Sequence, residues 1–214
     1  MKYKLVIFDW QGTLIDVMGQ FVFQCITVSE RLGLPKVNPD EVMSSVHLDP
    51  WALIQTLFPA VESHKKQVFI EQFNHYRMHH CHDVCLFEGV NSLLSRLHKK
   101  NVFVGIATAA SLAMLKEELA FSGLSPFIDV IKTPDHTLCK PAPDMLNEIM
   151  AEVGAEKVDT LMIGDSRCDF EAAQNAGIDF IGIHLREQSL ITEVLEASGS
   201  VVDSIASLND VLFL

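Results

Sequence analysis

The chain has 214 residues, of which 49% are hydrophobic, so it is long enough and apolar enough for one packed core with a small accessory domain. Sixteen basic residues against twenty-eight acidic ones give a net charge of −12. Such a surface repels phosphate backbones and anionic lipid, so we expect neither nucleic acid nor membrane as a partner.

The cysteines and the amino-terminal segment indicate the cellular compartment in which the protein is expected. Five scattered cysteines do not form a regular disulfide framework, and they predict reduced thiols. The apolar run at the amino terminus is too short for a signal peptide, and no stretch approaches membrane-spanning length. We therefore expect a cytoplasmic protein.

Short apolar runs that alternate with helical patterns predict a parallel sheet. The first run, 4–8, is continuously apolar after Lys4, which is typical of a strand covered on both faces. The other predicted strands are 102–107, 128–131, 160–163 and 180–183, with a short edge strand at 201–202. The predicted helices are 90–99, 112–121, 145–153 and 170–176. This alternation predicts an α/β fold with a Rossmann-like, doubly wound parallel sheet.

The stretch 17–86 interrupts the alternation, because it shows helical periodicity and no convincing strand. Glycine and proline residues cut it into about four helices: Gly33, Pro35, Pro39, Pro50 and Pro59. We therefore expect a core domain formed by 1–16 and 87–214, and an inserted all-helical domain at 17–86.

Polar residues follow the predicted strands at their carboxyl ends, where open parallel sheets bind ligands. Asp9 follows the first strand, and Thr108 follows the second. Lys140 precedes a helix, and the segment GDSRCD places Asp165 and Asp169 after a later strand. Each residue alone is typical of a helix cap, a turn or a solvated surface. Their order and spacing together predict one site.

The segments FDWQGTLID, KPAPDML and GDSRCDFEAAQNAG resemble motifs of the haloacid dehalogenase superfamily. The similarity covers nearly the whole chain and is strongest to the phosphoglycolate phosphatase-like branch. It implies that 17–86 is a helical cap that closes over the site and sets substrate choice. It also implies a phosphoric monoester hydrolase that acts on a small phosphorylated metabolite, as a monomer or a homodimer.

The resemblance implies a magnesium site and a nucleophile. Asp9 would attack phosphorus and form an aspartyl-phosphate. Mg²⁺ would be held by the carboxylates of Asp9 and Asp165 and by the main-chain carbonyl of Gln11. Asp169 would lie next to the metal or behind its direct ligands. Hard oxygen donors of this kind are those that Mg²⁺ prefers.

The resemblance also implies how the phosphate is bound. Lys140 would supply a fixed positive charge, and Thr108 a hydroxyl donor. The N–H groups after Thr108, beginning at Ala109, are similar to an anion-binding nest. Gly12 permits the tight turn that brings further N–H groups toward the phosphate.

Gln11 departs from the family pattern, which reads D-x-D-G-T. In the family, the second aspartate protonates the leaving oxygen and then activates water. An amide only donates or accepts hydrogen bonds, so Gln11 removes proton transfer and leaves the main-chain metal ligand in place. General acid–base catalysis is worth roughly 10²–10⁴ in rate, so the sequence predicts a slowed or altered enzyme.

Two other hydrolase activities remain open. Dehalogenases of the superfamily also lack the second aspartate, but they use no metal, and Asp165 and Asp169 argue against that activity. Phosphonoacetaldehyde hydrolases read D-W-A-G-T, close to the D-W-Q-G-T found here. They need a Schiff-base lysine from the cap, and the candidates Lys36, Lys65 and Lys66 lie beside turns or in a solvated-looking helix start.

A protein without catalysis remains open as well. A silent family member that binds a phosphorylated ligand or a protein partner would explain Gln11. A decayed site would also be free to lose Asp9, Lys140 or Asp165, and all three are present.

The stretch HYRMHHCHDVC, residues 75–85, contains soft metal ligands. They are His75, His79, Cys81, His82 and Cys85. Zinc binding is one interpretation, although the spacing matches no standard zinc motif, and the last helix of the insertion with its linker is the other.

Gln11 leads to a prediction from sequence alone. Aryl phosphates, whose leaving groups need little protonation, should be turned over, whereas alkyl phosphates should react poorly and the phosphoenzyme should persist. Gln11→Asp is expected to raise alkyl phosphate turnover at least roughly tenfold, the low end of acid–base catalysis. Steady-state turnover of both proteins on both esters with Mg²⁺ checks this. An unchanged rate in a folded variant would show that Gln11 is not the deficit.

Overall fold

The computed structural model describes residues 2–45, 50–79, 84–185 and 201–213. The chain divides into two compact units. The core unit comprises Met1–Asp16 and Leu86–Leu214, and the helical unit comprises Val17–Cys85.

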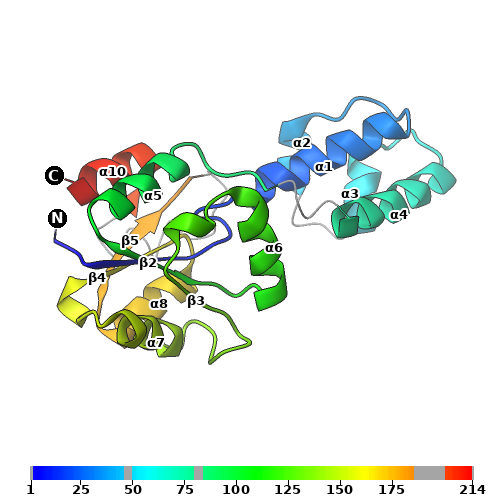
Figure 1. The fold of residues 1–214 in the computed structure, drawn as a ribbon. Coiled ribbons are helices and arrows are strands. Elements are labelled where there is room, and N and C mark those ends of the chain that lie inside the picture. The colour runs from blue at the N-terminus through cyan, green and yellow to red at the C-terminus, as the bar shows by residue number, and fades with distance from the viewer. Residues whose placement is uncertain (1, 46–49, 80–83, 186–200, 214) are drawn as a thin grey trace. The chain divides into compact units, whose positions relative to one another are not determined.

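In its described residues, the core unit holds a six-stranded sheet in the order β3-β2-β1-β4-β5-β6 (Figure 1). The strands are β1 (Leu5–Phe8), β2 (Phe103–Ala107), β3 (Val130–Lys132), β4 (Thr160–Gly164), β5 (Asp179–Ile183) and β6 (Val201–Val202). Every neighbouring pair is parallel. This arrangement confirms the doubly wound α/β fold that the sequence predicts.

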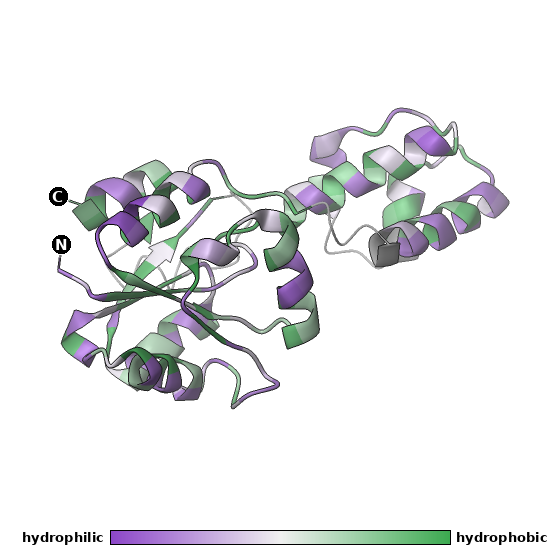
Figure 2. Ribbon diagram, viewed as in Figure 1, coloured by the Kyte–Doolittle hydropathy of each residue, from purple (hydrophilic) through white to green (hydrophobic). Residues whose placement is uncertain are grey.

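Helices cover both faces of the sheet, which is why its central strands are apolar throughout (Figures 1 and 2). The α-helices in the described part of the core unit are α5 (Val90–Lys99), α6 (Leu112–Ser122), α7 (Asp144–Val153), α8 (Arg167–Ala176) and α10 (Ile205–Phe213). On one face, Ile149 of α7 and Ala172 of α8 share a buried cluster with Ile7 of β1. Figure 1 shows α5 and α10 on the opposite face.

The register of β1 determines where the site lies. Phe8, the last residue of β1, is level with Ile106 of β2 and Ile163 of β4. The residues that follow these three therefore reach the carboxyl edge of the sheet at the same height. The N–H of Asp9 extends this pairing by donating to the carbonyl of Ile163 at 2.9 Å.

The helical unit has a core of its own. Its helices are α1 (Val17–Arg31), α2 (Pro39–Ser45), α3 (Pro50–Leu57) and α4 (Ser63–His79), and its described residues contain no strand. Val28, Val42 and Ile54 are buried in one apolar cluster with Phe69 and Phe73, whose rings stack 5.7 Å apart. Pro39 and Pro50 each begin a helix, a position where the missing N–H costs nothing. No helix in the described ranges is both long and apolar enough to span a bilayer.

The contact between β2 and α7 requires a residue without a side chain at position 105. A Cβ on Gly105 would lie 2.7 Å from Cγ2 of Ile149. We expect Gly105→Ala to lower the free energy of unfolding by about 1–3 kcal/mol, because it overpacks a tight core. Urea unfolding measures the loss. Ile149→Leu removes Cγ2, because leucine branches one carbon further from the backbone. The double variant Gly105→Ala/Ile149→Leu should therefore recover part of the lost stability. If the two losses simply add, the steric cause is wrong.

Candidate active site

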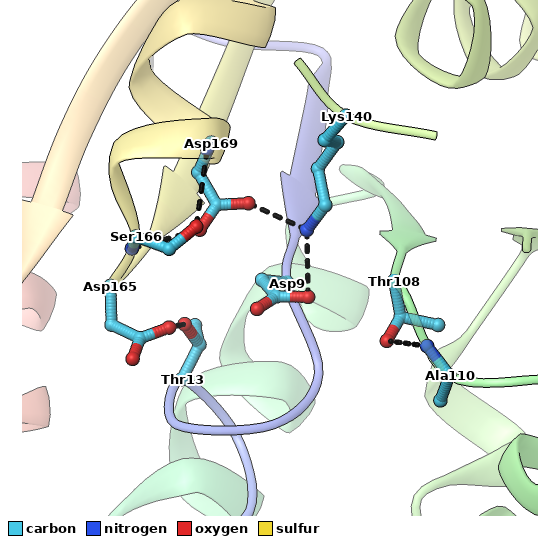
Figure 3. Close-up of polar contacts among 8 residues, drawn as sticks. All are labelled: Asp9, Thr13, Thr108, Ala110, Lys140, Asp165, Ser166 and Asp169. Atoms are coloured by element: carbon cyan, nitrogen blue, oxygen red, sulfur yellow. Dashed lines mark hydrogen bonds and ion pairs between the residues drawn. The ribbon is translucent and has the colours of Figure 1, made fainter. Parts of the chain in front are cut away.

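Three carboxylates converge at the carboxyl edge of the sheet (Figure 3). Asp9 follows β1, Asp165 follows β4, and Asp169 lies in the first turn of α8. One oxygen from each lies within 4.8 Å of the others. The structure therefore brings together the three aspartates that the sequence analysis singled out.

Lys140 binds two of these aspartates. Its Nζ lies 2.8 Å from Oδ1 of Asp9 and 2.6 Å from Oδ1 of Asp169. Only 5% of the Lys140 side chain is exposed, and none of the Asp169 side chain. Burial lowers the pKa of Lys140, but the charges of Asp9 and Asp169 outweigh it and raise that pKa above its ordinary value. The ammonium is therefore charged and held in one place.

Both oxygens of Asp169 are engaged. Oδ1 binds Lys140, and Oδ2 accepts hydrogen bonds from the N–H and the hydroxyl of Ser166 at 2.9 and 2.5 Å. The Ser166 hydroxyl in turn accepts from the N–H of Asp169, so the two residues form a capping box at the start of α8. This cap explains why α8 begins at Arg167, three residues earlier than periodicity predicts. Asp169 is thus suited to orienting Lys140 more than to binding a metal directly.

The turn after Asp9 packs against Asp165. The hydroxyl of Thr13 donates to Oδ1 of Asp165 at 3.2 Å. Gly12 has a φ of 84°, and a Cβ there would lie 2.3 Å from Oδ2 of Asp165. Glycine is therefore needed both for the backbone conformation and for the close approach of the carboxylate.

The pKa values of Asp9 and Asp165 lie above their ordinary values, chiefly because both groups are buried. Burial is the main cause for Asp9, where it outweighs the opposing charge of Lys140 and raises the pKa to about 7 with help from Asp169. Burial, followed by the charge of Asp169, raises the pKa of Asp165 to about 6. The single ammonium of Lys140 does not neutralise three neighbouring carboxylates, so the site keeps an excess of negative charge. A divalent cation such as Mg²⁺, which prefers hard oxygen ligands, would neutralise that excess.

Thr108 lies at the carboxyl end of β2, across from Asp9 in Figure 3, and is 1% exposed. Its Oγ1 accepts a hydrogen bond from the N–H of Ala110 at 3.1 Å. The hydroxyl hydrogen remains a donor. The N–H of Ala110 is already used in this hydrogen bond to Thr108. In the predicted phosphate-binding turn, the amide that remains as a candidate donor is therefore that of Ala109.

The side chain of Gln11 extends to α6. Its Nε2 lies 4.0 Å from Sδ of Met114. The indole N–H of Trp10 donates to Oε2 of Glu118, another residue of α6, at 2.6 Å. The side chains of residues 10 and 11 of the motif therefore both contact α6.

The lysines considered for a Schiff base lie in the helical unit. Lys36 and Lys65 are exposed, as the sequence suggested. Lys66 is buried, which differs from its solvated-looking pattern, because its ammonium donates to Oε1 of Gln55 at 2.7 Å and its stem lies inside the unit.

The proposed zinc ligands cannot be placed as a group. Cys81 and His82 lie outside the described residues, as does the side chain of His79. Zinc binding by this stretch stays a prediction.

Three supporting residues escaped the sequence analysis: Thr13, Ser166 and Glu118. The pattern S-x-x-D at 166–169 is a capping-box signal that could have identified Ser166. Thr13 and Glu118 carry no local signal, because their partners are distant in the chain.

Residues 6–183 match the family described as haloacid dehalogenase-like hydrolase. The chain belongs to this family. This confirms the resemblance drawn from the three sequence motifs.

Several relatives of the chain are phosphatases. The chain is 26% identical to a phosphoglycolate phosphatase from Vibrio vulnificus, over 100% of this chain and 97% of that protein. It is also 26% identical to an N-acetylmuramic acid 6-phosphate phosphatase from Pseudomonas aeruginosa, over 83% and 80%. The crystal structure of a hydrolase from Streptococcus pneumoniae TIGR4 shares the fold, with a TM-score of 0.75, 22% identity and 100% of both chains covered.

The raised pKa values predict pH-dependent metal binding. Below about pH 6, Asp9 and Asp165 carry protons that a divalent cation must displace. Mg²⁺ affinity should therefore rise roughly tenfold or more between about pH 5.5 and pH 8, and level off once both groups are ionised. Isothermal titration calorimetry in buffers of different ionisation enthalpy measures the affinity and the protons released. Equal affinity at both pH values would contradict the site.

Proposed function

We propose that this chain is a magnesium-dependent phosphatase that acts on a small phosphate monoester through Asp9. The observation that supports this most is the bond of Lys140 to both Asp9 and Asp169, with Asp165 at the same edge. This cluster would provide a buried nucleophile in Asp9, a fixed positive charge in Lys140, and carboxylate ligands for a metal in Asp9 and Asp165. Phosphoryl transfer needs mainly such positioning and charge neutralisation.

Asp9 carries the reaction. A carboxylate oxygen of Asp9 forms a bond to phosphorus while the ester P–O bond breaks; the leaving oxygen keeps the electron pair and takes a proton from solvent water. A second water then attacks phosphorus as the bond between Asp9 and phosphorus breaks, so that phosphate is released, the carboxylate is regenerated and the proton lost by that water passes to solvent. Mg²⁺, when bound by the Asp9 and Asp165 carboxylates and the main-chain carbonyl of Gln11, would reduce repulsion between nucleophile and phosphate.

The remaining residues bind and orient the phosphate. Lys140, held by Asp169, offers its positive charge to phosphate oxygens beside Asp9. The Thr108 hydroxyl and the Ala109 amide donate from the end of β2. Gly12 keeps the turn close enough for backbone donors to approach.

Gln11 limits which esters react quickly. Its amide supplies no proton to the leaving oxygen and takes none from water. The phosphoglycolate and sugar-acid phosphatases among the relatives suggest a small phosphorylated metabolite as substrate. We assign substrate choice to the helical unit as a cap.

A set of aspartate variants tests this function. Asp9→Asn keeps the shape of the side chain but removes the nucleophile, so release of phosphate from an aryl ester should fall at least roughly 10³-fold. Asp165→Asn should weaken Mg²⁺ binding at least roughly tenfold. The matched control is Asp210→Asn, the same change on the exposed surface of α10, which should alter neither. Phosphate release and calorimetry are the measurements; full activity of Asp9→Asn would exclude the mechanism.

The same assays separate the alternatives. Chelation by EDTA should abolish turnover of the aryl ester. Halide release from a 2-haloacid that resists EDTA would indicate a dehalogenase. A lysine adduct trapped by borohydride with phosphonoacetaldehyde would indicate a phosphonatase. Binding of phosphate esters without turnover would indicate a silent family member.

A further inference from the structure

The turn that follows β2, residues 108–112, is bound at both ends to the segment around the end of β3. At its start, the N–H of Thr108 donates to the carbonyl of Lys132 at 3.2 Å. At its end, the N–H of Leu112, the first residue of α6, donates to Oδ2 of Asp135 at 2.7 Å. The first bond extends the pairing of β2 with β3, whereas the second depends on a side chain.

Asp135 is held in place by Thr133, which directly follows β3. Thr133 is fully buried, and its hydroxyl donates to Oδ2 of Asp135 at 3.1 Å. The N–H of Thr133 donates to Nδ1 of His136 at 3.2 Å, which fixes the backbone on the other side of the carboxylate. The N–H of Leu112 and then the hydroxyl of Thr133 lower the pKa of Asp135 from its ordinary value, so the group is ionised at neutral pH.

The bond to Asp135 differs in purpose from the cap of α6. Ser111 is the N-cap of the helix, and its hydroxyl accepts the N–H of Met114 at 3.3 Å. The bond from Ala110 to Oγ1 of Thr108 shapes the turn internally. Asp135 is exposed to solvent, so we assign it little of the stability. What its carboxylate adds is a fixed location of the turn relative to β3.

We propose that Asp135 is a positioning residue of the candidate active site, which holds the 108–112 turn so that the Thr108 hydroxyl and the Ala109 amide stay directed at the phosphate. The inference rests on the proposed function, which assigns the phosphate to this turn. Figure 3 shows Thr108 across from Asp9, so a phosphate at Asp9 would lie between them. Donors that are fixed in advance need no reorganisation as charge develops in the transition state. Loss of the anchor should therefore slow the reaction more than it weakens binding of the ester.

The kinetic test compares three substitutions with wild type on an aryl phosphate with Mg²⁺. Asp135→Ala removes the acceptor, so kcat should fall roughly tenfold or more while KM stays within about threefold. Asp135→Asn keeps an acceptor oxygen for the N–H of Leu112 and should retain at least roughly a third of the wild-type kcat. Thr133→Val removes one donor to Asp135 and leaves the other, so its kcat should lie between those of the two Asp135 variants.

The matched control is Asp203→Ala, which removes another exposed carboxylate at the start of a helix. Asp203 accepts the hydroxyl of Ser207 at 2.9 Å beside the first turn of α10. This change should leave kcat and KM as they are in wild type. A loss of kcat equal to that of Asp135→Ala would show a general effect of helix ends and would overturn the inference.

Hydrogen–deuterium exchange tests the anchor without any turnover. The amides of residues 108–115 should exchange at least roughly tenfold faster in Asp135→Ala than in wild type, and those of β4 at an unchanged rate. Asp135→Asn should show little of this increase. Unchanged exchange at 108–115 in Asp135→Ala would overturn the inference.

The two measurements separate this inference from the proposed function. If wild type hydrolyses no ester, the phosphatase function fails, while the exchange rates still decide whether Asp135 holds the turn. If wild type is active, a wild-type kcat in folded Asp135→Ala would overturn the role of Asp135 and leave the phosphatase function standing. So would an equal loss of kcat in Asp135→Asn and Asp135→Ala, because the asparagine keeps the acceptor.

Discussion

The ion pairs of Lys140 with Asp9 and Asp169 organise the whole site. The lysine comes from the loop before α7, and the aspartates come from β1 and α8, so one ammonium ties together three elements that are distant in the sequence. The bonds are short and nearly free of solvent, so they lose little strength to screening. Ser166 supports these ion pairs, because its N–H binds the other oxygen of Asp169 and so holds that carboxylate toward Lys140.

The site is nevertheless unbalanced in charge. Three carboxylates share one ammonium, and burial, together with the negative charge of Asp169, raises the pKa values of Asp9 and Asp165. An arrangement of this kind is a disadvantage for a structural core and an advantage for a site that captures a cation and then an anion. Gly12 and Thr13 keep Asp165 close to Asp9 in spite of the repulsion, which indicates that the turn is built to hold the carboxylates together.

The sequence was sufficient for the sheet and for the aspartates, because continuous apolar runs and strand-end polar residues are local patterns. It was insufficient for Glu118, Thr13 and the burial of Lys66, because each depends on a partner that only the tertiary fold brings near. The helix α10 was also not predicted, because its short apolar sequence follows a two-residue strand; Ser204, which caps it by accepting the N–H of Ser207 at 3.1 Å, was a local signal that went unused. Gln11 was recognised as a departure from the family, but the contact of its side chain with Met114 of α6 could not be read from the motif.

The register of β1 has a consequence for how the chain is made. This strand is synthesised before its neighbours β2 and β4, which lie far downstream in the sequence. The helical unit is continuous in sequence and has its own core, so it can fold while β1 still has no strand to pair with. During synthesis, the apolar strand that precedes Asp9 remains open to chaperones and to aggregation until β2 and β4 emerge. Asp9 can therefore meet Asp165 and Asp169 only after the segment that follows β4 has been translated.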